Sequence, residues 1–178
     1  GPIGRHEAMH PSQNRAVSSR GEVIDLSSVE TVARTTWPVA YAGIIPVEVK
    51  HRLLNSWYSP ESLSRALAAQ GSTFLVAEWN GSVIGFAQYM RRSVESVELT
   101  RIYVLPDAQR RGIGADLVNA GVATFAEEGL KRLTVSVEED NVVGRRFYEK
   151  MGFAEPRELT HEVQGYSLRL VEYRRPIS

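Results

Sequence analysis

A junction between a predicted strand and a predicted helix carries residue types that bind phosphate. The strand, residues 97–104, is rich in β-branched and aromatic residues, and a helical pattern follows the pair Arg110-Arg111 and the two glycines Gly112 and Gly114. The first N–H groups of a helix have no partner within it and carry partial positive charge, so they attract anions. Glycines let a ligand approach the backbone closely, and arginines add cations. The junction therefore predicts a site for a phosphate or pyrophosphate group.

Two common phosphate-binding motifs do not fit this junction. A P-loop requires Lys-Ser or Lys-Thr after its second glycine, and a dinucleotide fingerprint requires a third glycine where Leu117 stands. An ordinary strand-to-helix turn, in which the glycines serve only packing, stays open as the alternative.

A second stretch, about thirty residues farther along, places polar groups on one face of a short helix. With about 100° per residue, Asn141, Arg145 and Tyr148 share a face, while Val143 and Phe147 share another that we expect to enter the core. Asn141 is a natural N-cap for this helix. The alternative is that Phe147 and Tyr148 simply fill the interface between helix and sheet.

The elements that must position these two stretches form an α+β pattern, a mixed α/β fold. Asn80-Gly81 and Gln164-Gly165 predict hairpin turns, and the succession of strand, helix and strand after residue 93 predicts a parallel pair with a crossover helix. An antiparallel meander, a βαβ unit and a closing hairpin together predict a central mixed sheet of six or seven strands with helices on both faces. We expect strands at 22–26, 72–79, 82–92, 93–104, 131–137, 153–163 and 166–174, and helices at 29–37, 46–57, 60–70, 112–128 and 141–150.

Length and composition limit the class of protein. The 178 residues predict one domain, residues 21–178, after a polar stretch, residues 1–20, that we expect to be a disordered tail or tag remnant. Basic and acidic residues balance at 21 each, so no basic excess favours nucleic acid or an anionic membrane. The absence of cysteine excludes a disulfide framework and a cysteine nucleophile, and no metal site is expected. Without an apolar run of about 20 residues or a signal peptide, a cytoplasmic protein is expected.

Together, the two stretches resemble the signature of the GNAT superfamily of N-acetyltransferases. The first reads Gln-x-x-Gly-x-Gly from Gln109 to Gly114, and the second reads Asn-x(5)-Phe-Tyr-x-x-x-Gly-Phe from Asn141 to Phe153. The resemblance covers roughly residues 22–178 and implies the GNAT fold, acetyl-CoA as co-substrate and acetyl transfer to an amine. Because members of this family are often dimers, it also suggests a homodimer.

The resemblance also implies which residues bind the co-substrate and the acceptor. Residues implied at the pantetheine arm are Ile102, Tyr103 and Val104 through their backbone, together with Asn141 and Arg145. Residues implied at the pyrophosphate are Gln109, Arg110, Arg111, Gly112, Ile113, Gly114 and Ala115. Trp37 and Tyr41 would line the acceptor pocket, and their surroundings resemble a bacterial branch that includes polyamine acetyltransferases.

Tyr148 and Glu98 are the implied catalytic residues. An alkyl amine resembles lysine, with a pKa of about 10.4, so it must lose a proton before it attacks, and the departing thiolate needs a hydrogen-bond donor. The resemblance places Tyr148 near the sulfur, where a neutral phenol can donate. It places a carboxylate base, acting directly or through water, at Glu98, with Glu78 and Glu138 as weaker candidates.

The sequence therefore predicts an acetyl-CoA-dependent enzyme that acetylates the primary amine of a small molecule, polyamine-like or other, by direct attack in a ternary complex. Two alternatives stay open. One is a non-catalytic acyl-CoA-binding regulatory module, and the other is an enzyme that acetylates a protein N-terminus or a lysine. Small amines, rather than nucleic acids or membranes, are the expected partners.

Overall fold

The computed structural model describes residues 3–7, 15–17, 23–25, 71–163 and 165–177, with single positions between residues 31 and 65. The elements are β1 (Ile3–Glu7), β2 (Arg15–Val17), β3 (Val23–Asp25), β4 (Ser72–Trp79), β5 (Ser82–Arg91), β6 (Ser96–Val104), the 3-10 helix η1 (Pro106–Arg111), α4 (Ile113–Glu127), β7 (Arg132–Glu138), α5 (Val142–Lys150), β8 (Ala154–Val163) and β9 (Tyr166–Pro176). The single positions are helical and fall within the three helices predicted before residue 71. The rest of those helices, including Trp37, lies outside the described residues, and so does Tyr41 between the first two of them.

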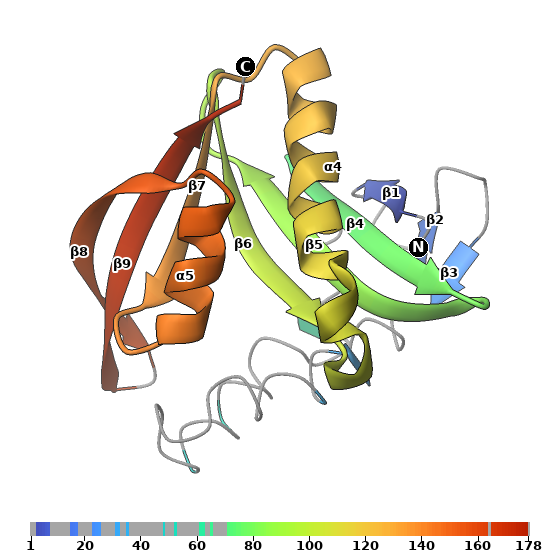
Figure 1. Cartoon of the computed structure of the whole chain (residues 1–178), viewed down its shortest axis with the longest axis horizontal. Helices are drawn as coiled ribbons and strands as arrows, with labels where there is room; N and C mark the ends of the chain where they lie inside the picture. The colour runs from blue at the N-terminus through green and yellow to red at the C-terminus, as the bar shows by residue number, and fades with distance from the viewer. Residues whose placement is uncertain are drawn as a thin grey trace.

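A seven-stranded mixed sheet forms the centre of the molecule, in the order β1-β4-β5-β6-β7-β9-β8 (Figure 1). The one parallel pair in the described sheet joins β6 to β7, from Ser96 opposite Arg132 to Leu99 opposite Val135, and α4 connects these two strands. In Figure 1, α4 crosses β4, β5 and β6, and α5 lies over β7 and β9 on the same face. The predicted mixed α/β sheet, its parallel pair and its closing hairpin are confirmed.

A bulge in β6 separates it from β7. Gln88 of β5 lies opposite Arg101 and its neighbour Tyr89 lies opposite Leu99, so Thr100 is an extra residue in β6. The Thr100 hydroxyl donates to the main-chain carbonyl of Gln88 at 3.2 Å. A bulge bends its strand and increases the local twist. Because the parallel pairing also ends at Leu99, the two strands diverge from this point.

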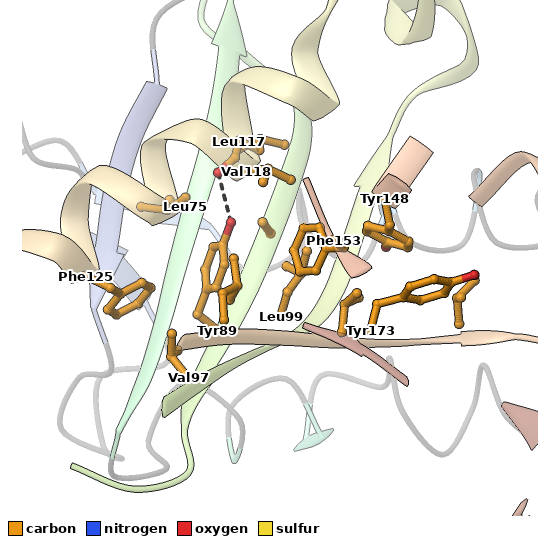
Figure 2. Close-up of a cluster of buried hydrophobic side chains, with 14 of the residues drawn as sticks. Leu75, Tyr89, Val97, Leu99, Leu117, Val118, Phe125, Tyr148, Phe153 and Tyr173 are labelled. Carbon is orange, nitrogen blue, oxygen red and sulfur yellow. Dashed lines mark hydrogen bonds between the residues drawn. The ribbon is translucent and has the colours of Figure 1, made fainter. Parts of the chain in front are cut away.

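The core lies between the sheet and the two helices (Figure 2). Tyr89 is fully buried, and the centroid of its ring lies 5.2 Å from that of Phe125. Its hydroxyl donates a hydrogen bond to the Leu117 carbonyl at 2.9 Å. Gly121 gives this ring its space, because a Cβ at this position would overlap the phenol. A single tyrosine therefore fixes how closely α4 approaches β5.

The N-terminal strands differ from the sequence-based expectation. Residues 1–20 were expected to lie outside the fold, but β1 pairs with β4 at the sheet edge, from Ile3 opposite Ala77 to Glu7 opposite Thr73. The strand expected at 22–26 is found as β3, but it pairs with β2 in a separate two-stranded sheet. Main-chain hydrogen bonds hold an edge strand and require no hydrophobic alternation, so the composition of residues 1–20 gave no signal.

Candidate active site

A pocket of about 850 Å³ opens where β6 and β7 diverge. Its walls come from the second half of β6, the end of β7, the first turn of α4 and the face of α5. The predicted residues Ile102, Tyr103 and Val104 all line it, as do Asn141 and Tyr148. Strand divergence therefore brings residues from both sequence motifs to one cavity.

The start of α4 supplies backbone N–H groups to this pocket. Gly112 has a φ of 74°, a left-handed conformation that ends η1 and begins α4, which explains why glycine stands here. The first helical hydrogen bond runs from the Asp116 amide to the Gly112 carbonyl at 3.0 Å, so the amides of residues 113–115 have no partner within the helix. Gly112, Gly114 and Ala115 line the pocket, and Ile113 is buried in the core.

Gln109 and Gly114 fix the shape of this corner. The Gln109 side chain donates from Nε2 to the Val104 carbonyl at 3.1 Å, which ties η1 to the end of β6. A Cβ on Gly114 would lie 3.4 Å from Cζ of Phe147, so glycine allows α4 and α5 to come close. The Gln109 side chain and the absence of a side chain at Gly114 therefore serve packing, and a ligand at this corner would meet the backbone.

The first turn of α5 presents apolar groups to the same pocket. The Asn141 side chain accepts a hydrogen bond from the Gly144 amide at 2.9 Å and caps the helix, as predicted. Val142 and Val143 line the pocket, and Val143 is 81% exposed. The prediction that Val143 enters the core is wrong, because Val143 is exposed and faces the pocket instead. The pocket thus combines exposed valines with the start of α4, which attracts anions. This combination suits a ligand that has an apolar arm and a charged end.

Tyr148 is buried at the inner end of this pocket. Its exposed fraction is 8%. The centroid of its ring lies 5.3 Å from that of Phe147 and 5.6 Å from that of Phe153, and Figure 2 shows the second pair. Burial raises the pKa of Tyr148 above its ordinary value, and the Glu138 carboxylate raises it further. The phenol therefore stays protonated at neutral pH and can serve as a hydrogen-bond donor.

Glu98, the predicted base, lies outside this pocket. Val97 and Leu99 enter the core, so Glu98 projects from the opposite face of the sheet. It lines a separate hollow of about 360 Å³ and accepts a hydrogen bond at Oε1 from Nε of Arg92 at 2.9 Å. The structure does not bring Glu98 and Tyr148 together, because the bulge that opens the pocket follows Glu98 in the strand.

Two of the predicted arginines, Arg111 and Arg145, do not line the pocket. Arg145 donates from Nε to the Tyr173 hydroxyl at 2.9 Å and from Nη1 to the Glu139 carbonyl at 3.1 Å, so it ties α5 to β9 and lines no part of the pocket. The Arg111 guanidinium lies 5.9 Å from the centroid of the Trp79 ring. A helical projection gives the direction of a Cβ, and long side chains turn from there to nearby partners. Arg110 contributes backbone to η1, and its side chain lies outside the description.

Several lining residues were missed or given low weight. Thr100, Arg101 and Ser136 were not singled out, and Glu138 was only a weaker candidate. Thr100 and Arg101 reach the pocket because of the bulge, for which the sequence has no signal. Glu138 could have been ranked higher, since it directly follows the predicted strand 131–137 and precedes the capping Asn141 by three residues.

Comparison with known proteins identifies the family. The sequence profile of the Acetyltransferase (GNAT) family matches residues 36–153. A spermidine N(1)-acetyltransferase of Thermoplasma acidophilum is 30% identical over 133 residues, which cover 72% of this chain and 82% of that protein. An uncharacterised N-acetyltransferase of Mycobacterium tuberculosis is 29% identical over 129 residues, which cover 72% of this chain and 83% of that protein. The chain belongs to the Acetyltransferase (GNAT) family and is an acetyltransferase.

Solved structures share the fold. The crystal structure of the PaiA N-acetyltransferase of Thermoplasma acidophilum in complex with coenzyme A matches with a TM-score of 0.74 and 23% identity, covering 99% of each chain. The ribosomal-protein-S18-alanine N-acetyltransferase of Escherichia coli matches with a TM-score of 0.64 and 20% identity, covering 86% and 88%. In the part of the chain described here, no helix has both the length and the apolar character needed to cross a bilayer.

Proposed function

We propose that this acetyltransferase transfers an acetyl group from acetyl-CoA to the primary amine of a small molecule, by direct attack within a ternary complex. The observation that carries this proposal is one pocket lined by both the α4 N-terminal corner and the Tyr148 side chain. The GNAT family membership and the relative named as a spermidine acetyltransferase support the class of reaction.

The residues present fit the pyrophosphate and the pantetheine arm of coenzyme A. Backbone amides at the start of α4 suit the pyrophosphate, because they are oriented donors at the positive end of a helix. The second half of β6 lies along the pocket after its pairing with β7 has ended, so an extended arm with amide groups can align there as a strand would. The exposed Val142 and Val143 suit the apolar parts of that arm.

Tyr148 provides the chemistry at the far end of the arm. When bound there, acetyl-CoA supplies the acetyl group and a thiolate leaving group. The Tyr148 phenol donates a hydrogen bond to the sulfur as negative charge develops on it, and its raised pKa keeps the donor proton in place over the neutral range. The aromatic contacts with Phe147 and Phe153 hold the ring in this orientation.

The decisive experiment measures thiol release from acetyl-CoA across a panel of acceptors. Spermidine, shorter alkyl diamines, lysine peptides and peptides with a free N-terminus are each mixed with enzyme and acetyl-CoA, and the acetylated product is identified by mass spectrometry. Rapid release with a small amine and slower release with every peptide is expected. Tight binding of coenzyme A without release on any amine would favour the non-catalytic module, and faster release with peptides would favour protein acetylation.

A further inference from the structure

Glu138 is the carboxylate best placed for the acceptor. Two acidic residues occur among the described lining of the pocket, Glu138 and Asp140. Asp140 is exposed in the turn before α5, whereas Glu138 is half-buried at the last position of β7. Glu98 occupies the other hollow and is paired with Arg92.

Glu138 and Tyr148 reach the pocket from opposite faces of the sheet. Val135 and Val137 of β7 enter the core beneath α5, so Glu138 projects to the far face, while Tyr148 comes from α5 itself. Both residues nevertheless line the same cavity, and the Glu138 charge acts on the phenol. The gap between β6 and β7 therefore passes through the sheet. A thioester held in this gap has the phenol on one side and the carboxylate on the other.

The charged surroundings of Glu138 come from four elements. The charged and titratable residues that line the pocket together with Glu138 are Arg101 and Tyr103 on β6, Asp140 in the turn and Tyr148 on α5. On the neighbouring strand β9, Leu170 lies directly opposite Glu138. The next β9 residue on the same face of the sheet is Glu172, which forms an ion pair with Arg157. Of the two acidic residues that line the described pocket, Glu138 is thus the half-buried one.

We propose that Glu138 is a catalytic residue that binds the ammonium form of the acceptor and takes the proton that this ammonium must lose before its nitrogen can attack. This role rests on the proposed function and narrows the acceptor to an amine that is a cation at neutral pH. The nitrogen forms a bond to the acetyl carbon, and the carbon–sulfur bond breaks. The electron pair goes to the sulfur beside the Tyr148 hydroxyl. The nitrogen loses two protons in all: the first passes from the ammonium to Glu138 before attack and then to water, and the second leaves as the amide forms and neutralises the departing thiolate. No other co-reactant is required.

The test compares Glu138→Gln with its neighbour Glu139→Gln as a matched control of the same charge change. Glu139 does not line the pocket, and its main-chain atoms, not its side chain, form the hydrogen bonds to Arg145 and Arg169. Each variant is assayed with spermidine and with a fluorinated ethylamine that is already neutral at pH 7. Glu98→Gln is assayed in parallel, and coenzyme A affinity is measured by calorimetry.

Glu138→Gln should lower kcat/KM for spermidine by about 100-fold or more, within the range of acid–base catalysis, while coenzyme A affinity stays unchanged. The loss should be much smaller with the fluorinated amine, which has no proton to give up before attack, and Glu138→Asp should recover part of the activity. Equal losses with both amines, no difference between Glu138→Gln and Glu139→Gln, or a large loss only in Glu98→Gln would overturn the role of Glu138. Absence of thiol release by the wild-type enzyme on every amine would instead overturn the proposed function.

Discussion

Replacing Tyr148 by phenylalanine should lower turnover without lowering stability. The hydrogen bonds among the described residues include none at the Tyr148 hydroxyl, and the ring contacts with Phe147 and Phe153 do not depend on it. Removing an oxygen from a buried site where it has no such bond leaves no partner unsatisfied. The melting temperature should therefore stay the same or rise slightly.

The loss of turnover follows from the charge on the sulfur. Burial and Glu138 raise the pKa of Tyr148 well above the value of about 8.5 expected for a thiol, so the phenol acts mainly by hydrogen-bonding to the thiolate rather than by full ionisation. A hydrogen bond to a charged group contributes about 1.5–3 kcal/mol. At about 1.4 kcal/mol per factor of ten, kcat should fall between roughly ten-fold and 150-fold.

Tyr89→Phe is the matched control, since Tyr89 is a second buried tyrosine that lines no part of the pocket. Its hydroxyl donates to the Leu117 carbonyl, so this variant should lose about 1–2 kcal/mol of stability while turnover is retained. The assays are thiol release for kcat, calorimetry for acetyl-CoA affinity and thermal melting for stability. Unchanged kcat in Tyr148→Phe, or a fall in kcat that merely follows a fall in affinity, would remove Tyr148 from the chemistry.

Three further predictions concern stability. Gly121→Ala should destabilise the protein by about 1–3 kcal/mol in urea unfolding, because the new Cβ would lie 2.9 Å from Cε1 of Tyr89 and closer still to its hydroxyl; an unchanged midpoint would show that α4 can shift. Asn141→Ala should cost about 1 kcal/mol in the same measurement, because the Gly144 amide loses its capping acceptor. Stability should fall above about pH 10, where the unfolded chain loses tyrosine protons that the buried Tyr89 and Tyr148, with raised pKa values, retain. Each of these two tyrosines lowers the free energy of unfolding by about 1.4 kcal/mol per pH unit in this range. The free energy of unfolding of either Tyr→Phe variant should therefore fall less steeply with rising pH than that of the wild type.

The order of the sheet elements could be predicted because its signals are local. Asn80-Gly81 gives a turn with both residues at positive φ, 51° and 79°, the geometry that connects β4 to β5. The end of the strand pattern at Val104 and the glycine at position 112 predict the junction between β6 and α4. Pairing of β1 with the sheet edge could not be predicted, because a main-chain ladder leaves no residue pattern.

The backbone part of the site was predicted better than the side-chain part. The strand edge and the helix corner depend on residues adjacent in sequence, so a motif locates them. The direction of Arg145 depends on Tyr173, which lies 28 residues away, and the exclusion of Glu98 depends on one extra residue in β6. Such facts follow from register and long-range packing, which periodicity does not encode.

The difference between backbone and side-chain parts of the site also explains why similarity to known acetyltransferases supports the co-substrate more strongly than the acceptor. Coenzyme A would be held largely by main-chain groups, and these are kept whenever the fold is kept, even at the 23% identity of the PaiA structure. In the proposed function, acceptor recognition would depend instead on side chains at the pocket such as Glu138, where each substitution changes charge and shape. A relative that acetylates spermidine therefore supports the reaction type more strongly than the acceptor. The acceptor has to be read from the charges in this pocket, and a carboxylate opposite the phenol favours a cationic amine.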